Sequence, residues 1–324
     1  MKAEIIDCEI LYRPEDSRLG YLPEGPYPID GKRFSWVSIQ HSAESPIGSL
    51  NIFDCPNRTN RSFELPGRPG FAFATNRPDR FVIGLERTLG LFDVASRTWE
   101  PLKENIDGHT DGTIINDGVA FPGGLIFGCK DLNFQQEKAG LYWYRSADQT
   151  LIELRRDQIC SNGKVILQDT DERADIVRFL DIDSPKKTVV QYELDVTRVT
   201  LSAPEIVLDL RAEAVFPDGM IAAPDGSGVI ISMYDPRDSE FGETRQYNLQ
   251  TGECVCRWCS VGSPQVTCPQ LIRFGGEIKL VMTTATENMN SEKLAAHPNA
   301  GCLFVGATDF KQLPSSPKFM LDKE

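Results

Sequence analysis

Short apolar stretches alternate with turn residues along almost the whole chain. Runs of β-branched and aromatic residues, bounded by Gly, Pro, Asp and Asn, begin near residues 34, 81, 125, 176, 229 and 278. Such runs are typical of β-strands. No window of a dozen residues places apolar side chains at three- and four-residue steps without an intervening Gly or Pro, so helical periodicity is almost absent. The pattern predicts an all-β protein.

The predicted strands recur with a regular period. Successive starts are 47, 44, 51, 53 and 49 residues apart. A second apolar strand follows each of them, at 48–54, 89–93, 140–144, 189–195, 245–249 and 301–305. Four strands of roughly six residues, together with their turns, need about forty to fifty residues, which matches one propeller blade.

Six copies at this spacing predict one six-bladed β-propeller over residues 1–312, with no internal domain boundary. The strand expected at residues 4–12 is predicted to pair into the last blade, which would close the ring and hide its open edges. Residues 313–324 are rich in Pro and Ser near their start and are predicted to form a loose tail.

The charge balance limits the partners of the protein. The 324 residues include 34 Lys and Arg against 47 Asp and Glu, which gives a net charge of −13, and only three His. Nucleic acid and anionic membrane surfaces are therefore not expected as partners, because both require a basic face. No apolar stretch is long enough to span a membrane, and the amino terminus lacks the apolar run of a signal peptide, so we expect a cytoplasmic protein.

The nine cysteines are scattered and odd in number, which favours reduced, mostly buried thiols over a disulfide framework. Cys254, Cys256 and Cys259 leave a zinc or redox site open as an alternative. A zinc site needs a fourth ligand, and Cys268 is the only near candidate in sequence. We favour buried thiols that fill the core of a blade.

Carboxylates and amides occur next to Gly at one phase of the repeat, shortly before the repeated strands. Four fragments share this phase, namely Glu24-Gly25, Asn116-Asp117-Gly118, Asn162-Gly163 and Asp218-Gly219. Each fragment alone is typical of a β-turn. Because the innermost strands of a propeller line its channel, residues at matching places should converge at one mouth. Two carboxylates and two amides around one point suit an oxygen-preferring divalent cation such as calcium, magnesium or manganese.

These segments together resemble the senescence marker protein/gluconolactonase/luciferin-regenerating family, whose best-known members are regucalcin and sugar-acid lactonases. The resemblance runs from residue 24 to about residue 306, in family order and spacing. The matching segments are Glu24-Gly25-Pro26, Asn116-Asp117-Gly118, Ser161-Asn162-Gly163, Pro217-Asp218-Gly219-Met220, Phe274-Gly275-Gly276, 281–285 and 297–304. The family is a six-bladed propeller, in agreement with the count of repeats.

The resemblance implies that Glu24, Asn162 and Asp218 bind one divalent metal in the channel. Asn116 would lie beside it and contact the substrate or, through water, the metal. Calcium is the first choice, with magnesium, manganese, zinc and iron as alternatives. Members of the family hydrolyse lactones: the metal polarises the carbonyl group and stabilises the developing oxyanion. Asp218 is the candidate for accepting the proton of the attacking water.

The positions that would contact substrate depart from the family pattern. Sugar-acid lactonases of the family carry an Arg where this chain has Ile114, and an acid where it has Leu132 and Asn133. The guanidinium group of such an Arg binds hydroxyl or carboxylate groups through its N–H donors. Its absence argues for another, less polar substrate. Lys130 or Asp131 could supply a replacement contact. The expected substrate contacts are thus Ile114, Asn116, Lys130 and Asn133.

The sequence therefore predicts a metal-dependent hydrolase of the lactonase type that acts on a small molecule. Two alternatives stay open. One is a propeller that binds a metal or small ligand without catalysis, like a calcium-binding regucalcin, since the altered substrate positions are compatible with lost activity. The other is a protein-interaction propeller, which would need an exposed apolar patch on one face.

Overall fold

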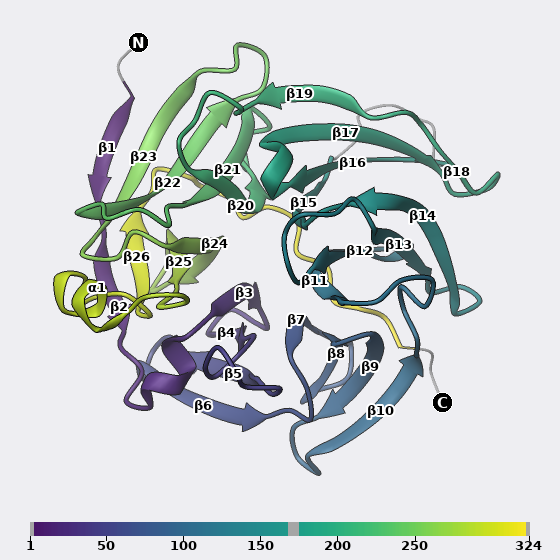
Figure 1. The fold of residues 1–324 in the computed structure, drawn as a ribbon, viewed down its shortest axis with the longest axis horizontal. Helices are drawn as coiled ribbons and strands as arrows, with labels where there is room; N and C mark the ends of the chain where they lie inside the picture. The colour runs from purple at the N-terminus through teal and green to yellow at the C-terminus, as the bar shows by residue number, and fades with distance from the viewer. Residues whose placement is uncertain (1–2, 168–174, 322–324) are drawn as a thin grey trace.

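The computed structural model describes residues 3–167 and 175–321. In this part of the chain six sheets, antiparallel apart from one added parallel strand, are arranged in a ring (Figure 1), which confirms the six-bladed β-propeller predicted from the repeat. The first three blades are formed by β3 (Pro23–Pro28), β4 (Arg33–Ser38), β5 (Ser49–Asp54) and β6 (Thr59–Glu64); β7 (Pro69–Ala74), β8 (Arg80–Leu85), β9 (Thr88–Asp93) and β10 (Thr98–Lys103); and β11 (Thr113–Phe121), β12 (Gly124–Asp131), β13 (Ala139–Arg145) and β14 (Thr150–Gln158).

The other three blades follow the same order from the channel outwards. They are formed by β15 (Ser161–Ile166), β16 (Ile176–Asp183), β17 (Thr188–Asp195), β18 (Thr200–Leu201) and β19 (Glu205–Asp209); β20 (Phe216–Ala222), β21 (Gly228–Tyr234), β22 (Phe241–Asn248) and β23 (Cys254–Val261); and β24 (Val266–Phe274), β25 (Glu277–Thr284) and β26 (Leu303–Ala307). Within the described residues, three short helices lie in loops: η1 (Ser17–Gly20), η2 (Ser184–Lys186) and α1 (Ser291–Ala296).

The amino-terminal segment covers the outer edges of two blades rather than one. β2 (Glu9–Tyr12) pairs antiparallel with β26 and completes the last blade, as expected for the strand at residues 4–12. β1 (Glu4–Asp7) instead pairs in parallel with β23 of the fifth blade. The backbone N–H of Cys8, between them, donates to the carbonyl of Cys259 at 2.9 Å. Both edges are therefore protected against pairing with another chain.

The strands that repeat in the sequence are the second strand of each blade: β4, β8, β12, β16, β21 and β25. They are the most apolar because both of their faces pack against neighbouring blades, and their side chains are almost all buried. The core is consequently a series of clusters between adjacent blades. One example is the contact of Phe71 from β7 with Ile115 and Phe127 of the next blade.

The chain after β26 crosses the face of the ring opposite to the starts of the innermost strands (Figure 1, yellow). The sequence predicts a loose tail here, because residues 313–324 lack a strand pattern. In the structure Phe319 is buried, its N–H donates to the carbonyl of Ala74 at 2.9 Å, and Tyr27 Oη donates to the carbonyl of Pro317 at 2.6 Å. These contacts attach residues 317–319 to the first two blades. Residues 322–324 lie outside the described part of the chain.

Within the described ranges, no helix has the length and apolar character needed to cross a membrane.

Candidate functional site at one mouth of the channel

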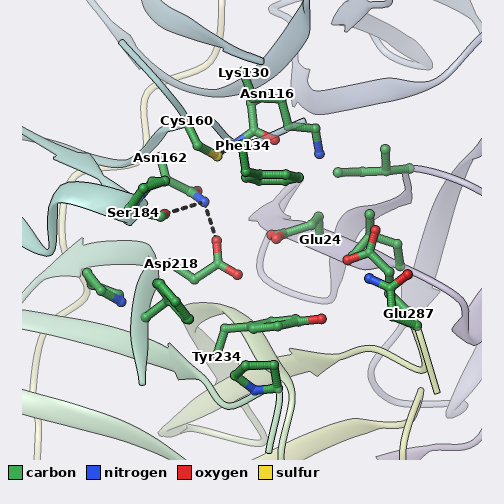
Figure 2. Close-up of a pocket in the computed structure, with 17 residues that line it drawn as sticks. Glu24, Asn116, Lys130, Phe134, Cys160, Asn162, Ser184, Asp218, Tyr234 and Glu287 are labelled. Carbon is green, nitrogen blue, oxygen red and sulfur yellow. Dashed lines mark hydrogen bonds between the residues drawn. The ribbon is translucent and has the colours of Figure 1, made fainter. Parts of the chain in front are cut away.

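A cavity of about 320 Å³ lies where the innermost strands begin. Glu24 from β3, Asn116 from β11, Asn162 from β15 and Asp218 from β20 all line it (Figure 2). The structure therefore brings together the four polar residues that share one phase of the sequence repeat. They come from blades one, three, four and five, so the cavity is closed by segments far apart in the chain.

A β-bulge in each strand directs these side chains into the channel. The register between the first and second strand of a blade shifts between Glu24 and Tyr27, between Ile115 and Asp117, between Asn162 and Lys164, and between Pro217 and Met220. The four fragments are thus bulges on innermost strands, not the turns that each resembles in isolation. A bulge adds one residue to a strand and turns its side chain towards a new direction.

The glycines of these fragments allow neighbouring innermost strands to approach closely. A Cβ on Gly163 would lie 2.5 Å from the carbonyl oxygen of Asp218 and 2.6 Å from Cβ of Met220. A Cβ on Gly219 would lie 2.5 Å from Sγ of Cys268. Only a residue without a side chain fits at such positions. The Asn-Gly and Asp-Gly pairs of the sequence therefore combine a polar side chain that enters the cavity with a glycine that packs against the next blade.

Hydrogen bonds connect two of the candidate metal ligands. Asn162 Nδ2 donates to a carboxylate oxygen of Asp218 and, at 3.2 Å, to Ser184 Oγ, as Figure 2 shows. Asn162 Oδ1 accepts from the N–H of Gly163 at 3.1 Å. Asn116 is fixed separately, because its Nδ2 donates to the carbonyl of Ser161 at 3.1 Å.

Burial and mutual repulsion perturb the acids of the channel. Burial, and then the charges of Asp218 and Asp117, raise the pKa of Glu24 well above its usual range. Burial and the charge of Asp117 likewise raise the pKa of Asp218, whereas Lys130 acts in the opposite direction. Burial also raises the pKa of Asp117, opposed by Lys164. Among the described residues, none forms a salt bridge with Glu24 or Asp218.

This arrangement fits a divalent cation. Two buried carboxyl groups repel one another in a medium of low dielectric constant, and a cation between them would remove the cost of ionising both. Over residues 3–167 and 175–321, no group of three or more His, Cys, Asp or Glu side chains could hold a metal ion. The candidate set contains only two carboxylates, Glu24 and Asp218, so it would require the amide of Asn162 as its third protein ligand.

The expected substrate contacts divide into two groups. Asn116 and Lys130 line the cavity, and Lys130 Nζ lies 5.6 Å from the centre of the Phe134 ring. Ile114 is buried in β11 opposite Lys130, and Asn133 is exposed in the loop after β12; neither is among the residues that line the cavity.

Asp131, the other possible replacement contact, organises the loop that follows it. Burial alone would raise its pKa, but the N–H groups of Gln136 and Gln135 and the ammonium of Lys138 lower the pKa of Asp131 to about 2. Its carboxylate is thus bound to its own loop, with Lys138 Nζ at 3.1 Å.

The sequence analysis missed the residues that surround the polar set. They are Leu22, Ile39, Phe134, Cys160, Ser184, Pro185, Phe216, Pro217, Tyr234, Pro236, Glu287 and Asn288. Many of them follow the second strand of a blade, as Ile39 follows β4, Ser184 follows β16 and Glu287 follows β25. A search directly after each repeated strand, at one phase of the period, could have found this group. The sequence analysis considered such positions only after the strand that begins near residue 125.

The cysteines of the zinc alternative are distributed over two strands. Cys254, Cys256 and Cys259 lie on β23 at the outside of blade five, whereas Cys268 is on β24, an innermost strand. Cys256, Cys259 and Cys268 are buried.

Comparisons with known proteins agree with this fold. The family model for the SMP-30/Gluconolactonase/LRE-like region matches residues 22–286. A Bacillus subtilis protein named "Putative sugar lactone lactonase YvrE" is 27% identical over 288 residues, which cover 87% of this chain and 90% of the relative. The 6-deoxy-6-sulfogluconolactonase of Pseudomonas putida is 24% identical over 276 residues, or 82% and 86% of the two chains.

Two solved structures show the same fold. The calcium-binding protein regucalcin from Agrobacterium tumefaciens superposes with a TM-score of 0.80 at 19% identity, covering 99% of this chain and 100% of that one. Luciferin-regenerating enzyme superposes with a TM-score of 0.76 at 18% identity, covering 94% and 98%. Fold and cavity define a six-bladed propeller with buried acids at one channel mouth. The chain belongs to the SMP-30/gluconolactonase/LRE-like family, as its sequence motifs predict.

Proposed function

We propose that the protein is a metal-dependent lactonase that opens a cyclic ester in the channel-mouth cavity. The observation that carries this proposal is the convergence of Glu24, Asn162 and Asp218 on one cavity, with two buried carboxyl groups that form no salt bridge within the described chain. The relatives named as lactonases support the reaction class.

Glu24, Asn162 and Asp218 would hold the cation, and calcium is the first candidate because the ligands are all oxygen atoms and a structural neighbour is named as calcium-binding. When bound, the cation supplies a Lewis acid that polarises the lactone carbonyl group. The amide nitrogen of Asn162 donates to Asp218 in this structure. Ligation of a cation by the amide oxygen therefore requires the side-chain amide to rotate.

Asp218 is the proposed general base. A carboxylate whose pKa is raised by burial accepts a proton more readily near neutral pH than an exposed one. Asp218 takes one proton from the attacking water, whose oxygen bonds to the carbonyl carbon. The ring C–O bond then breaks, and the released oxygen takes up the proton from Asp218. Water and lactone thus give one hydroxy acid, and the carboxylate is restored.

The test is a panel of lactones assayed with and without calcium, magnesium, manganese or zinc. We expect hydrolysis only with a cation, and a loss of at least about a hundredfold in kcat for Asp218→Asn, because the general base is removed. Asp225→Asn is the matched control, since Asp225 also precedes a glycine but lies in the exposed turn between β20 and β21. Cation binding without any turnover would favour the alternative of a non-catalytic, regucalcin-like binding propeller.

A further inference from the structure

We infer that the cavity takes a lactone with an apolar substituent, such as an aryl ring or an alkyl chain, in preference to a polyhydroxylated sugar lactone. This inference rests on the proposed lactonase function and specifies its substrate class. It follows from the distribution of polar and apolar groups around the cavity, from the position of Phe134, and from the lone ammonium of Lys130.

The polar groups of the cavity come from the innermost strands and from the segments around them. Glu24, Asn116, Asn162 and Asp218 all belong to innermost strands. Around them stand side chains from flanking segments and loops. The apolar ones include Leu22, Ile39, Phe134, Phe216, Pro185 and Pro236, and the polar ones are Ser184, Tyr234, Glu287 and Asn288. The ester group of a substrate can thus meet polar atoms while the rest of the molecule meets apolar walls.

A hydroxyl group of a sugar lactone that lies against these apolar side chains has no hydrogen-bond partner there. Ser184 Oγ, a polar group of the wall, already accepts from Asn162. A hydroxyl group that leaves water without gaining a new hydrogen bond weakens binding, whereas an apolar substituent that leaves water strengthens it. The apolar part of the lining therefore favours an apolar substituent over a polyol.

The aromatic ring of Phe134 lines the cavity and stays exposed to water unless a ligand covers it. Its side chain is 48% exposed, and its φ of 53° is in the left-handed region, which bulky residues rarely adopt. The loop around it is fixed, because the N–H of Phe134 donates to the carbonyl of Asp131 at 2.9 Å. An apolar substituent lying against the ring would remove it from water.

Lys130 positions the ester group of the substrate. Its ammonium group lines the cavity, lies over the Phe134 ring, and forms no hydrogen bond or ion pair with any residue of the described chain (Figure 2). An ammonium group in this place attracts the carbonyl oxygen of the ester and the carboxylate of the product. The ester group then lies beside Lys130 and Asp218, and its substituent lies against the adjacent Phe134 ring.

The first experiment compares kcat/KM for dihydrocoumarin and δ-decalactone with that for glucono-1,5-lactone, in the same divalent cation. We expect the two apolar lactones to be favoured at least tenfold. Phe134→Ala should raise KM for the apolar lactones about tenfold and change KM for glucono-1,5-lactone less than twofold. Phe241→Ala is the matched control, because Phe241 is 42% exposed and does not line the cavity. Preference for the sugar lactone would overturn the inference and leave the lactonase proposal intact.

The second experiment does not depend on turnover. The lactam analogue of dihydrocoumarin cannot be hydrolysed readily, so its affinity can be measured by calorimetry against that of gluconolactam. Tighter binding of the aryl lactam, lost in Phe134→Ala, would support the inference even if every lactone in the panel resisted hydrolysis. Equal or weaker binding of the aryl lactam would overturn it.

Discussion

At the scale of single residues, a buried ion pair contacts the backbone of the candidate site. Lys164 Nζ lies 3.2 Å from Asp181 Oδ1 and donates to the carbonyl of Asn162 at 3.1 Å. Ser161 Oγ donates to the same carboxylate at 3.0 Å. Both charged side chains are fully buried. Lys164 thus links the backbone of a proposed metal ligand to the interior of blade four and acts as a positioning residue.

We predict that Lys164→Met destabilises the protein by about 3 kcal/mol at pH 7, because it leaves the charge of Asp181 buried without a partner. Burial raises the pKa of Asp181 to about 6, although Lys164 opposes the shift. This pKa exceeds the value in the unfolded chain, so the native carboxyl group binds its proton more tightly, and ionisation costs stability as pH rises from about 4 to about 6.

Urea unfolding at pH 7 and pH 5 measures this effect. The loss in Lys164→Met should be smaller at pH 5, where protonation of Asp181 removes the unpaired charge. Lys279→Met is the control, since Lys279 pairs with Glu277 at 3.4 Å on the surface and should cost less than about 1 kcal/mol. An equal loss at both pH values would contradict the assignment to Asp181.

At the scale of elements, the sequence predicted the repeat well because each second strand is buried on both faces and reads as an apolar run, as in β12 and β21. It predicted that the four polar residues lie close together, because the fragments that contain them recur at one phase of the repeat. It could not show that Phe134 lines the cavity while Asn133 does not, because that depends on a three-dimensional loop held by Asp131. Nor could it show that Phe319 anchors the tail, since a single aromatic residue makes no pattern.

The close approach of β15 and β20 gives a prediction at this scale. Gly163→Ala would place a Cβ 2.5 Å from the carbonyl oxygen of Asp218, so blades four and five must separate. We expect a loss of about 1–3 kcal/mol in unfolding free energy and at least tenfold weaker cation binding, because Asn162 and Asp218 move apart. Denaturant unfolding and calcium titration by calorimetry measure the two effects. A Cβ on Gly31 meets nothing within 4 Å, so Gly31→Ala should change neither the unfolding free energy nor cation binding.

At the scale of the whole molecule, the ring is closed by short contacts between segments far apart in sequence. β2 completes the last blade, β1 covers the fifth, and residues 317–319 join the first two blades from the opposite face. The proposed metal ligands add a connection of the same kind. Glu24 belongs to blade one, Asn162 to blade four and Asp218 to blade five, so a bound cation would connect blades across the channel.

We therefore predict that calcium raises the thermal stability of the entire propeller, and more so at pH 8 than at pH 5. The pKa values of Glu24 and Asp218 are raised by burial and by neighbouring acids, so protons compete with the cation. Without cation, ionisation of these groups makes stability fall as pH rises above about 4 through their native pKa values. With cation at about a hundred times its dissociation constant, binding to the ionised pair adds about 2.7 kcal/mol and reverses this trend.

Thermal unfolding over that pH range, with calcium or with a chelator, checks the prediction without any assay of turnover. The double variant Glu24→Gln with Asp218→Asn should gain nothing from calcium, and in chelator it should be more stable than the unchanged protein at pH 8, because two buried charges are gone. An equal calcium effect at both pH values, or a calcium effect that survives in the double variant, would place the cation elsewhere. A calcium effect confined to high pH and to intact Glu24 and Asp218 would connect the buried acids of the channel mouth to the stability of all six blades.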